Sequence, residues 1–317
     1  MFKKKPGQWL DIQVYRKNPV LTGLTVMIAA MLVLSLAFLG IRNKNEWGRD
    51  RRELLRCWEE GTYGDVYVLS GQWLAKKPLD FFLLSLRGFS SYQLAAAQIN
   101  ASNTLRYIDD CIVSLRKALL TREGERDANL RYVLGKAYYH KGASYADLAV
   151  RYLEEARGNG FRAPDIAEYL GLAYAELGDY RNSVVSLSES LNSEDGSYVS
   201  DLRLLAIARS YIGLGEGNSA RAYLVRCIEN SRDATVVIQA RLLLGKVLAE
   251  QGEAEEAEEQ FRAILDESGE NADAHFELGE LYAALGDATR ARAEWRRALR
   301  INPGHGEARE KLGIYMP

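Results

Sequence analysis

The chain has 317 residues, of which 47% are hydrophobic, and its formal net charge at pH 7 is −2. This length and composition are sufficient for one substantial folded domain. The near-neutral charge argues against a nucleic-acid-binding protein, because such proteins need a concentrated basic face.

An apolar segment close to the N-terminus is the first predicted element. Residues 18–41 contain no charged side chain, and they follow a basic tail, residues 1–17. As a helix, this segment would extend about 36 Å, enough to cross a hydrocarbon core of about 30 Å. We therefore expect one transmembrane helix. A cleaved signal peptide is the alternative, because Ser35-Leu36-Ala37 has the small-x-small form of a cleavage site.

The charges beside this segment bias its orientation only slightly. Lysines and arginines occur both in the tail and in residues 42–56. A long domain that follows a span can translocate regardless of its charge. We therefore expect the tail in the cytoplasm and the rest of the chain in the periplasm, as a single-pass protein of a bacterial inner membrane. The alternative is a cytoplasmic adaptor held at the membrane.

Residues 42–127 predict divergent helical repeats. Residues 79–120 have the pattern of two long helices, with Cys111, Leu115 and Ala118 as the inward stripe. Two of the three cysteines, Cys111 and Cys227, fall on inward stripes, and Cys57 lies far from both. No spacing of metal ligands is present, so we interpret the cysteines as buried thiols and predict no metal site.

Residues 128–305 repeat one helical pattern five times. Three copies have Leu-Gly-x-x-Tyr on a first helix, while one has Ile207-Ala208 in place of Leu-Gly and another has Leu248 in place of the tyrosine. The second helix generally carries a small, a bulky and a small residue. The intervals between equivalent small residues are 36, 37, 37, 34 and 34 residues, which is typical of stacked helical hairpins. The equivalent residues are Gly135, Gly171, Ala208, Gly245, Gly279 and Gly313.

The copy at residues 272–305 is the clearest. Gly279 would let the partner helix approach closely, Gly286 would end the first helix, and Asp287 would cap the second. Pro303 would stop that second helix. The inward stripes of the two helices are Leu278, Tyr282, Ala291, Trp295 and Ala298. Residues 306–317 repeat only a first helix and would form a C-terminal cap.

These motifs resemble the tetratricopeptide repeat, a family of helix-turn-helix repeats of about 34 residues. The resemblance implies an all-α fold, a right-handed α-solenoid of helical hairpins, here preceded by the single transmembrane helix. It also implies a protein that binds other proteins. The sequence contains no motif of a hydrolase, a phosphate-binding loop or a metalloprotease, so we predict no enzyme and no cofactor.

In this family the first helices line a groove that binds partners, and the resemblance assigns a set of groove residues here. The set is aromatic and apolar with basic points, which suits a peptide with apolar and acidic groups. The alternative is that these side chains pack against the adjacent repeat. The implied groove residues are Tyr132, Lys136, Tyr139, Glu168, Leu172, Leu205, Arg209, Leu242, Lys246 and Phe276.

Two second helices carry opposite charges. Glutamates gather at residues 253–259 and arginines at residues 290–300, and the two runs could face each other. For the whole chain we predict a membrane-anchored scaffold that assembles partner proteins in an envelope complex, such as a secretion or motility machine. The alternative function is a periplasmic chaperone or quality-control factor for unfolded or translocating clients.

Overall fold

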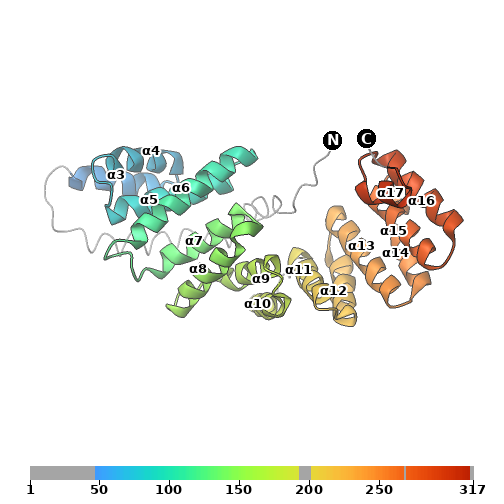
Figure 1. The fold of residues 1–317 in the computed structure, drawn as a ribbon. Coiled ribbons are helices and arrows are strands. Elements are labelled where there is room, and N and C mark those ends of the chain that lie inside the picture. The colour runs from blue at the N-terminus through green and yellow to red at the C-terminus, as the bar shows by residue number, and fades with distance from the viewer. Residues whose placement is uncertain (1–46, 193–200, 268, 315–317) are drawn as a thin grey trace. The chain divides into compact units, whose positions relative to one another are not determined.

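The computed structural model describes residues 47–192, 201–267 and 269–314 (Figure 1). These residues form helices joined by short connections, with no strand among them. The predicted tail, residues 1–17, and the predicted transmembrane helix, residues 18–41, lie outside the described residues. Within the described ranges, no helix combines the length and the apolar character that crossing a membrane requires.

Contacts divide the chain into two compact units, the first ending at Leu177 and the second beginning at Gly178. The boundary falls inside a predicted repeat, between its first and its second helix. Each unit has its own cluster of buried apolar side chains.

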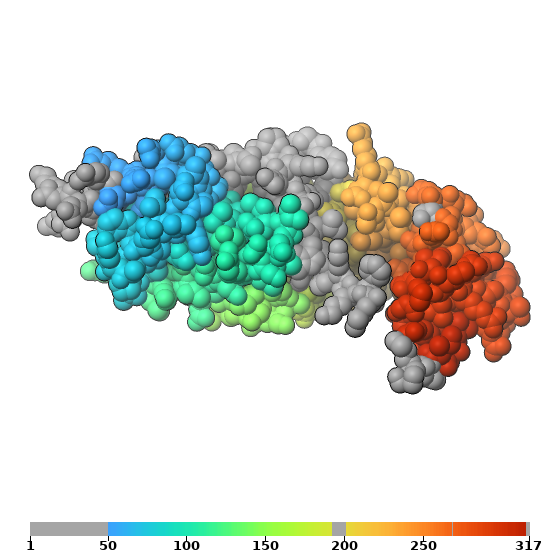
Figure 2. Space-filling model, turned by 90° about the horizontal axis from the view of Figure 1, so that it is seen from above, coloured from blue at the N-terminus to red at the C-terminus, as the bar shows by residue number. Residues whose placement is uncertain are grey.

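The first unit contains the predicted divergent repeats and the first predicted regular hairpin. Each helix contacts the next along the chain, and α5 with α6 forms the most extensive pairing. The helices α3 to α6 make a continuous, closely packed surface (Figure 2). The elements are α3 Trp47–Glu59, α4 Tyr63–Leu74, α5 Phe81–Ala96, α6 Ala101–Leu119, α7 Ala128–Lys141, the 3-10 turn η2 Ala143–Tyr145, α8 Ala146–Gly158 and α9 Ile166–Glu176.

The two long helices predicted for residues 79–120 are α5 and α6. Asp80 begins α5, since its carboxylate accepts a hydrogen bond from the backbone N–H of Leu83 at 3.1 Å. The predicted inward stripe of α6 is confirmed, because Cys111, Leu115 and Ala118 are all fully buried. A side chain at Gly88 of α5 would overlap Leu115, so this glycine lets the two helices approach closely.

The second unit contains the regular hairpins with the strongest sequence signal. Its first and second helices alternate, and consecutive first helices also contact each other, α11 with α13 and α13 with α15. The elements are α10 Tyr180–Asn192, α11 Asp201–Gly213, α12 Gly217–Asn230, α13 Ala234–Glu250, α14 Ala254–Glu267, α15 Ala272–Ala284, α16 Ala288–Ile301 and α17 Gly306–Lys311.

The turn between α15 and α16 has the predicted chemistry. Gly286 has a backbone φ of +80°, the left-handed region that favours glycine. The carboxylate of Asp287 then accepts a hydrogen bond from the backbone N–H of Arg290 at 2.9 Å and caps α16. Helix α16 ends at Ile301, two residues before Pro303. The predictions for this hairpin are therefore confirmed.

Helix pairs of the second unit pack closely because of their glycines. A side chain at Gly279 would overlap the indole ring of Trp295, and one at Gly245 would overlap the ring of Phe261. The close approach at Gly279 is as predicted. The longer spacing before Gly245 also has a structural cause, since α13 has 17 residues and α15 has 13. The additional residues lengthen a first helix and leave the packing around the glycine unchanged.

Candidate functional site

Three predicted groove cations occupy equivalent places in their repeats, and each forms a bond to the next first helix. Lys136 of α7 binds Asp165 at the start of α9, Arg209 of α11 binds Gln239 of α13, and Lys246 of α13 binds Glu277 of α15. The partners lie 29, 30 and 31 residues further along the chain. We call these contacts first-helix pairs. They connect consecutive repeats, so the cations have a structural role that the sequence analysis gave only as an alternative.

A fourth first-helix pair has the reverse polarity. Glu280 occupies the equivalent place in α15, and its carboxylate accepts a hydrogen bond from the amine of Lys311 of α17 at 2.6 Å. The separation is again 31 residues. Because this pair joins the last complete hairpin to α17, the predicted capping segment is held by the same kind of contact as a full repeat.

The pair in the first unit is buried. Lys136 and Asp165 are 5% and 7% exposed, and their charged atoms lie 2.7 Å apart. The hydroxyl of Tyr132 donates to the other carboxylate oxygen at 2.5 Å and accepts from Lys136 at 3.1 Å. The amine of Lys136 also lies 4.5 Å from the centre of the Tyr169 ring. The lysine charge is therefore balanced by a carboxylate and by aromatic faces.

This environment changes the titration of its neighbours. Burial, and then the charge of Asp165, raise the pKa of Tyr132 well above its ordinary value. Burial and the charge of Lys136 lower the pKa of His140 to about 3. The imidazole Nε2 of His140 lies 3.2 Å from the hydroxyl of Tyr169. At neutral pH the cluster therefore holds a neutral His140 and a neutral Tyr132 phenol.

The cations of the corresponding pairs in the second unit are open to solvent. Arg209 is exposed, and it donates to the side-chain oxygen of Gln239 at 2.9 Å. The side chain of Lys246 is 50% exposed, and its amine lies 2.9 Å from the carboxylate of Glu277. Burial is the largest effect on Glu277 and raises the pKa of its carboxyl, although Lys246 acts in the opposite direction. These cations remain within reach of a ligand.

The remaining predicted groove residues divide by burial. Tyr139, Leu205 and Phe276 are buried, while Glu168, Leu172 and Leu242 are partly exposed. With Tyr132 and Lys136, five of the ten implied residues are buried in packing. Tyr139 meets Tyr169 edge to face, with ring centres 5.4 Å apart, and Phe276 lies 4.8 Å from the ring of His305. The accessible part of the set therefore consists of Arg209, Leu242 and Lys246 in the second unit and of Glu168 and Leu172 in the first.

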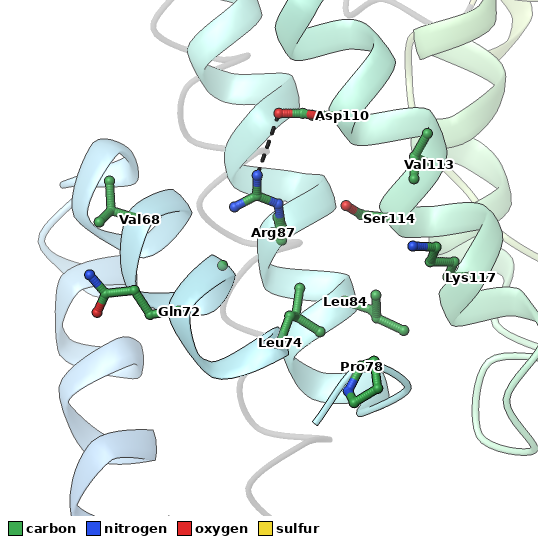
Figure 3. A pocket seen from close by; sticks show the side chains of 11 residues that line it. Val68, Gln72, Leu74, Pro78, Leu84, Arg87, Asp110, Val113, Ser114 and Lys117 are labelled. Atoms are coloured by element: carbon green, nitrogen blue, oxygen red, sulfur yellow. Dashed lines mark hydrogen bonds and ion pairs between the residues drawn. The ribbon is translucent and has the colours of Figure 1, made fainter. Parts of the chain in front are cut away.

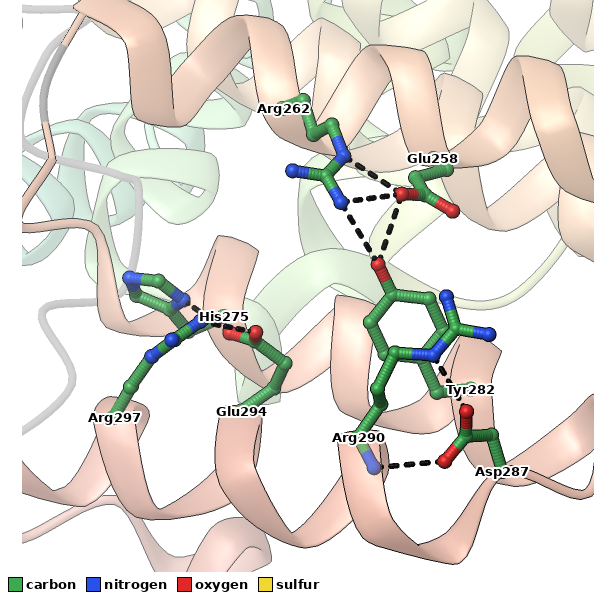
Figure 4. Close-up of polar contacts among 8 residues, drawn as sticks. All are labelled: Glu258, Arg262, His275, Tyr282, Asp287, Arg290, Glu294 and Arg297. Atoms are coloured by element: carbon green, nitrogen blue, oxygen red, sulfur yellow. Dashed lines mark hydrogen bonds and ion pairs between the residues drawn. The ribbon is translucent and has the colours of Figure 1, made fainter.

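A second group of polar contacts joins α14 to α15. Tyr282 is the tyrosine of the Leu-Gly-x-x-Tyr motif. Its hydroxyl lies 2.9 Å from the carboxylate of Glu258 and 3.1 Å from Arg262 (Figure 4). Tyr174 makes the same kind of contact with Glu154 of α8 at 3.2 Å. The tyrosine of the motif therefore also forms a hydrogen bond to the second helix of the preceding repeat. Its position in the motif did not reveal this contact.

The expected pairing of the two charged runs is not found among the ion pairs of the described residues. Arg221 of α12 binds the acidic run instead, with Glu253 and Glu256 each at 2.6 Å. Two arginines of α16 have partners within their own hairpin, since Arg290 binds Asp287 and Arg297 binds Glu294 (Figure 4). Glu253 and Glu256 of the acidic run therefore face the repeat before it, whereas Glu258 contacts Tyr282 of the repeat after it.

The histidines and cysteines do not form a metal site in the part of the chain that the structure describes. The Nδ1 of His275 lies 2.7 Å from the carboxylate of Glu294 in the buried interface of α15 and α16. His305 accepts a hydrogen bond from the backbone N–H of Ala308 and begins α17. All three cysteines are buried and free. These groups have local structural roles.

Comparison with known proteins supports the repeat assignment. The sequence profile of the tetratricopeptide repeat matches residues 205–271 and 242–306. No curated protein matches the sequence significantly.

Several solved structures resemble the fold. The C-terminal part of a TPR repeat-containing protein from Cytophaga hutchinsonii has a TM-score of 0.56 at 14% identity, over 84% of this chain and 99% of that chain. PilW, described as a widely conserved type IV pilus biogenesis factor, has a TM-score of 0.55 at 18% identity, over 71% and 97%. Pseudomonas aeruginosa pilF has a TM-score of 0.51 at 19% identity, over 72% and 97%. Residues 205–306 are therefore tetratricopeptide repeats, and the described chain is an all-helical solenoid of the tetratricopeptide type.

Proposed function

We propose that the protein is a scaffold that binds other proteins through the exposed first-helix residues of its second unit. The observation that carries this proposal is the pair of solvent-exposed cations, Arg209 and Lys246, on neighbouring first helices that also present the partly exposed Leu242. Exposed ion pairs contribute only about 0–1 kcal/mol. Lys246 can therefore accept a carboxylate of a partner on its exposed side, and Arg209, whose own partner is the neutral Gln239, can do the same.

The location of this scaffold is part of the proposal. We infer a single transmembrane helix at residues 18–41, with the repeats in the periplasm. Helix α3 begins at Trp47, so only residues 42–46 would separate the membrane from the first helix. Such a short tether raises the local concentration of membrane-bound partners. The proposed envelope complex depends on this location. Because PilW is described as a pilus biogenesis factor, a pilus or secretion machine is the first place to search for partner proteins.

The scaffold is tested by isolating the tagged full chain from its native membrane. We expect a partner that co-purifies in fixed stoichiometry, and we expect the variant Arg209→Ala/Lys246→Ala to lose it. The control is Arg232→Ala, an exposed arginine in the connection before α13. Recovery of many weakly held clients would instead support the chaperone function. Retention of the partner by the double variant would contradict binding through these cations.

The location is tested separately with a tag after Pro317. Protease added to intact spheroplasts should remove the tag while a cytoplasmic control protein survives. Survival of the tag until lysis would place the repeats in the cytoplasm and would leave only the adaptor function. Release of the chain from membranes by alkaline carbonate would contradict the anchor.

A further inference from the structure

The first unit contains a pocket of about 560 Å³ between α4, α5 and α6 (Figure 3). This volume lies in the range of about 300–1,000 Å³ that is usual for ligand sites. Val68 of α4 and Val113 of α6 stand on opposite walls, and Leu84 of α5 lies at the base.

The walls expose apolar side chains that the unit does not bury. Val68 is 52% exposed and Val113 is 51% exposed, whereas Leu84 is 2% exposed. Isolated apolar residues on a surface are ordinary. Here two of them border one concave space, and burial of both by a ligand would remove apolar surface from water.

The polar side of the pocket is built around Arg87. Its guanidinium donates to the backbone carbonyl of Tyr67 at 2.9 Å and lies 4.1 Å from the centre of the Tyr67 ring. The contact with the carboxylate of Asp110 is longer, 3.5 Å. A side chain at Gly71 of α4 would overlap the guanidinium, so the glycine makes the space that Arg87 occupies. The arginine is thus positioned with donor capacity toward the pocket.

A second cation completes the polar side. Lys117 is exposed on α6, and Figure 3 shows its amine directed toward the space beside Ser114 and Arg87. Among the contacts of the described residues, none pairs this amine with a carboxylate. The lining therefore carries two cations against one carboxylate, Asp110, which also accepts a hydrogen bond from the hydroxyl of Tyr67.

We propose that this pocket binds a peptide segment of a partner protein in which a bulky apolar residue stands next to an aspartate or glutamate. The apolar side chain lies between Val68 and Val113, and the carboxylate binds Lys117 and Arg87. The charge excess and the apolar walls together select this ligand, because neither an uncharged nor a basic peptide complements both. The inference rests on the proposed scaffold function and adds a second recognition site within the first unit.

The test uses the purified full chain and an array of octapeptides with a fixed central Leu-Asp or Phe-Glu pair and randomised flanks. A matched array carries Leu-Asn and Phe-Gln. We expect binding to the acidic array only. The best peptides are then measured by fluorescence anisotropy, and Lys117→Gln and Val113→Asp should each weaken binding at least tenfold.

Two controls separate the pocket from general effects. Arg122→Gln removes an exposed cation just beyond α6, and Leu120→Asp places a carboxylate on an apolar residue that is 84% exposed. Neither residue lines the pocket, so both variants should bind the peptides as the parent chain does. Thermal melting should be unchanged in all four variants, because each replaced side chain is exposed.

Several results would overturn the inference. These are equal binding of the amide array, unchanged affinity in Lys117→Gln and Val113→Asp, or no peptide binding at millimolar concentration. A change of self-association in Val113→Asp without peptide competition would identify a second copy of the chain as the occupant. If the native partner still co-purifies in these cases, the scaffold function stands and only the pocket assignment is wrong. If no partner co-purifies either, both are wrong.

Discussion

The amine of Lys136 and the carboxylate of Asp165 form a buried ion pair at 2.7 Å between the first helices α7 and α9. The same place in the second unit holds Lys246, whose side chain is half exposed where it pairs with Glu277. One position of the repeat therefore carries either a buried or an exposed contact. Burial decides which of these lysines is available to a partner protein.

Loss of one member of the buried pair should strongly destabilise the first unit. Replacement Lys136→Met keeps much of the volume but leaves Asp165 without its cation. Breaking a buried pair in this way costs about 3–5 kcal/mol. We expect a loss of this size in the free energy of unfolding, measured with urea. The double variant Lys136→Met/Asp165→Asn should recover part of it, and an unchanged midpoint in Lys136→Met would contradict the assignment.

The exposed pair should contribute much less. A double-mutant cycle with Lys246→Gln and Glu277→Gln should give a coupling of about 0–1 kcal/mol, because the side chain of Lys246 is half exposed and solvent screens it. Raising the salt concentration should reduce this coupling further. A coupling as large as that of the buried pair would mean that Lys246 is not free to exchange its partner, which would weaken the proposed function.

The glycine of the repeat motif should tolerate no side chain where a ring covers it. In Gly279→Ala the new methyl group would displace the indole of Trp295, which is 8% exposed. Overpacking of this kind costs about 1–3 kcal/mol. The control Gly306→Ala, where the added group meets no neighbouring atom, should change the stability by less than about 0.5 kcal/mol. Urea unfolding of both variants makes the comparison.

The first unit should lose stability as the pH falls from 7 to 5. Burial and Lys136 hold the pKa of His140 near 3 in the folded state, against about 6.5 when unfolded. The unfolded state therefore binds more protons between these values, and stability rises with pH across this window.

Replacement His140→Phe, which removes the titrating group, isolates this contribution. Between pH 7 and 5, the parent chain should lose about 2 kcal/mol more of its free energy of unfolding than the variant. Equal losses in the two proteins would show that His140 is protonated without cost in the folded state.

The buried cysteines should be chemically inert in the native chain. Burial raises the pKa of Cys227 to about 11 and raises the pKa of Cys111 further still. Thiolate is the reactive form, so a small disulfide reagent should leave both unmodified at pH 7.5. All three thiols should react after unfolding in urea. Rapid labelling of native Cys111 would show that α5 and α6 open readily.

The local parts of this fold could be predicted from the sequence. Gly286 and Asp287 define a turn by their own chemistry, and the stripe of Cys111, Leu115 and Ala118 follows the helical period. The close approach at Gly279 also followed from the motif. Each of these features depends on residues within one hairpin.

The hydrogen-bond and ion-pair partners of the polar side chains could not be predicted in the same way. Lys136, Arg209 and Lys246 were predicted as groove residues, but their partners lie about one repeat downstream. A search for polar residues 29 to 31 positions later would have found Asp165 and Glu277. The pocket could not be predicted from the sequence, because Val68 and Val113 come together only when α4, α5 and α6 pack.

In the first-helix pair of Glu280 with Lys311 the acid precedes the base along the chain, the reverse of the pairs that Lys136 and Lys246 form. This reversal restricts the order in which the repeats can follow one another. Excision of residues 272–305 would remove one complete hairpin and move Lys311 to the place that Glu277 occupies opposite Lys246. Two lysines would then meet where a lysine and a glutamate now pair. The hairpins of this array are consequently not interchangeable modules, because a shortened chain would have to change its charges at the new junction.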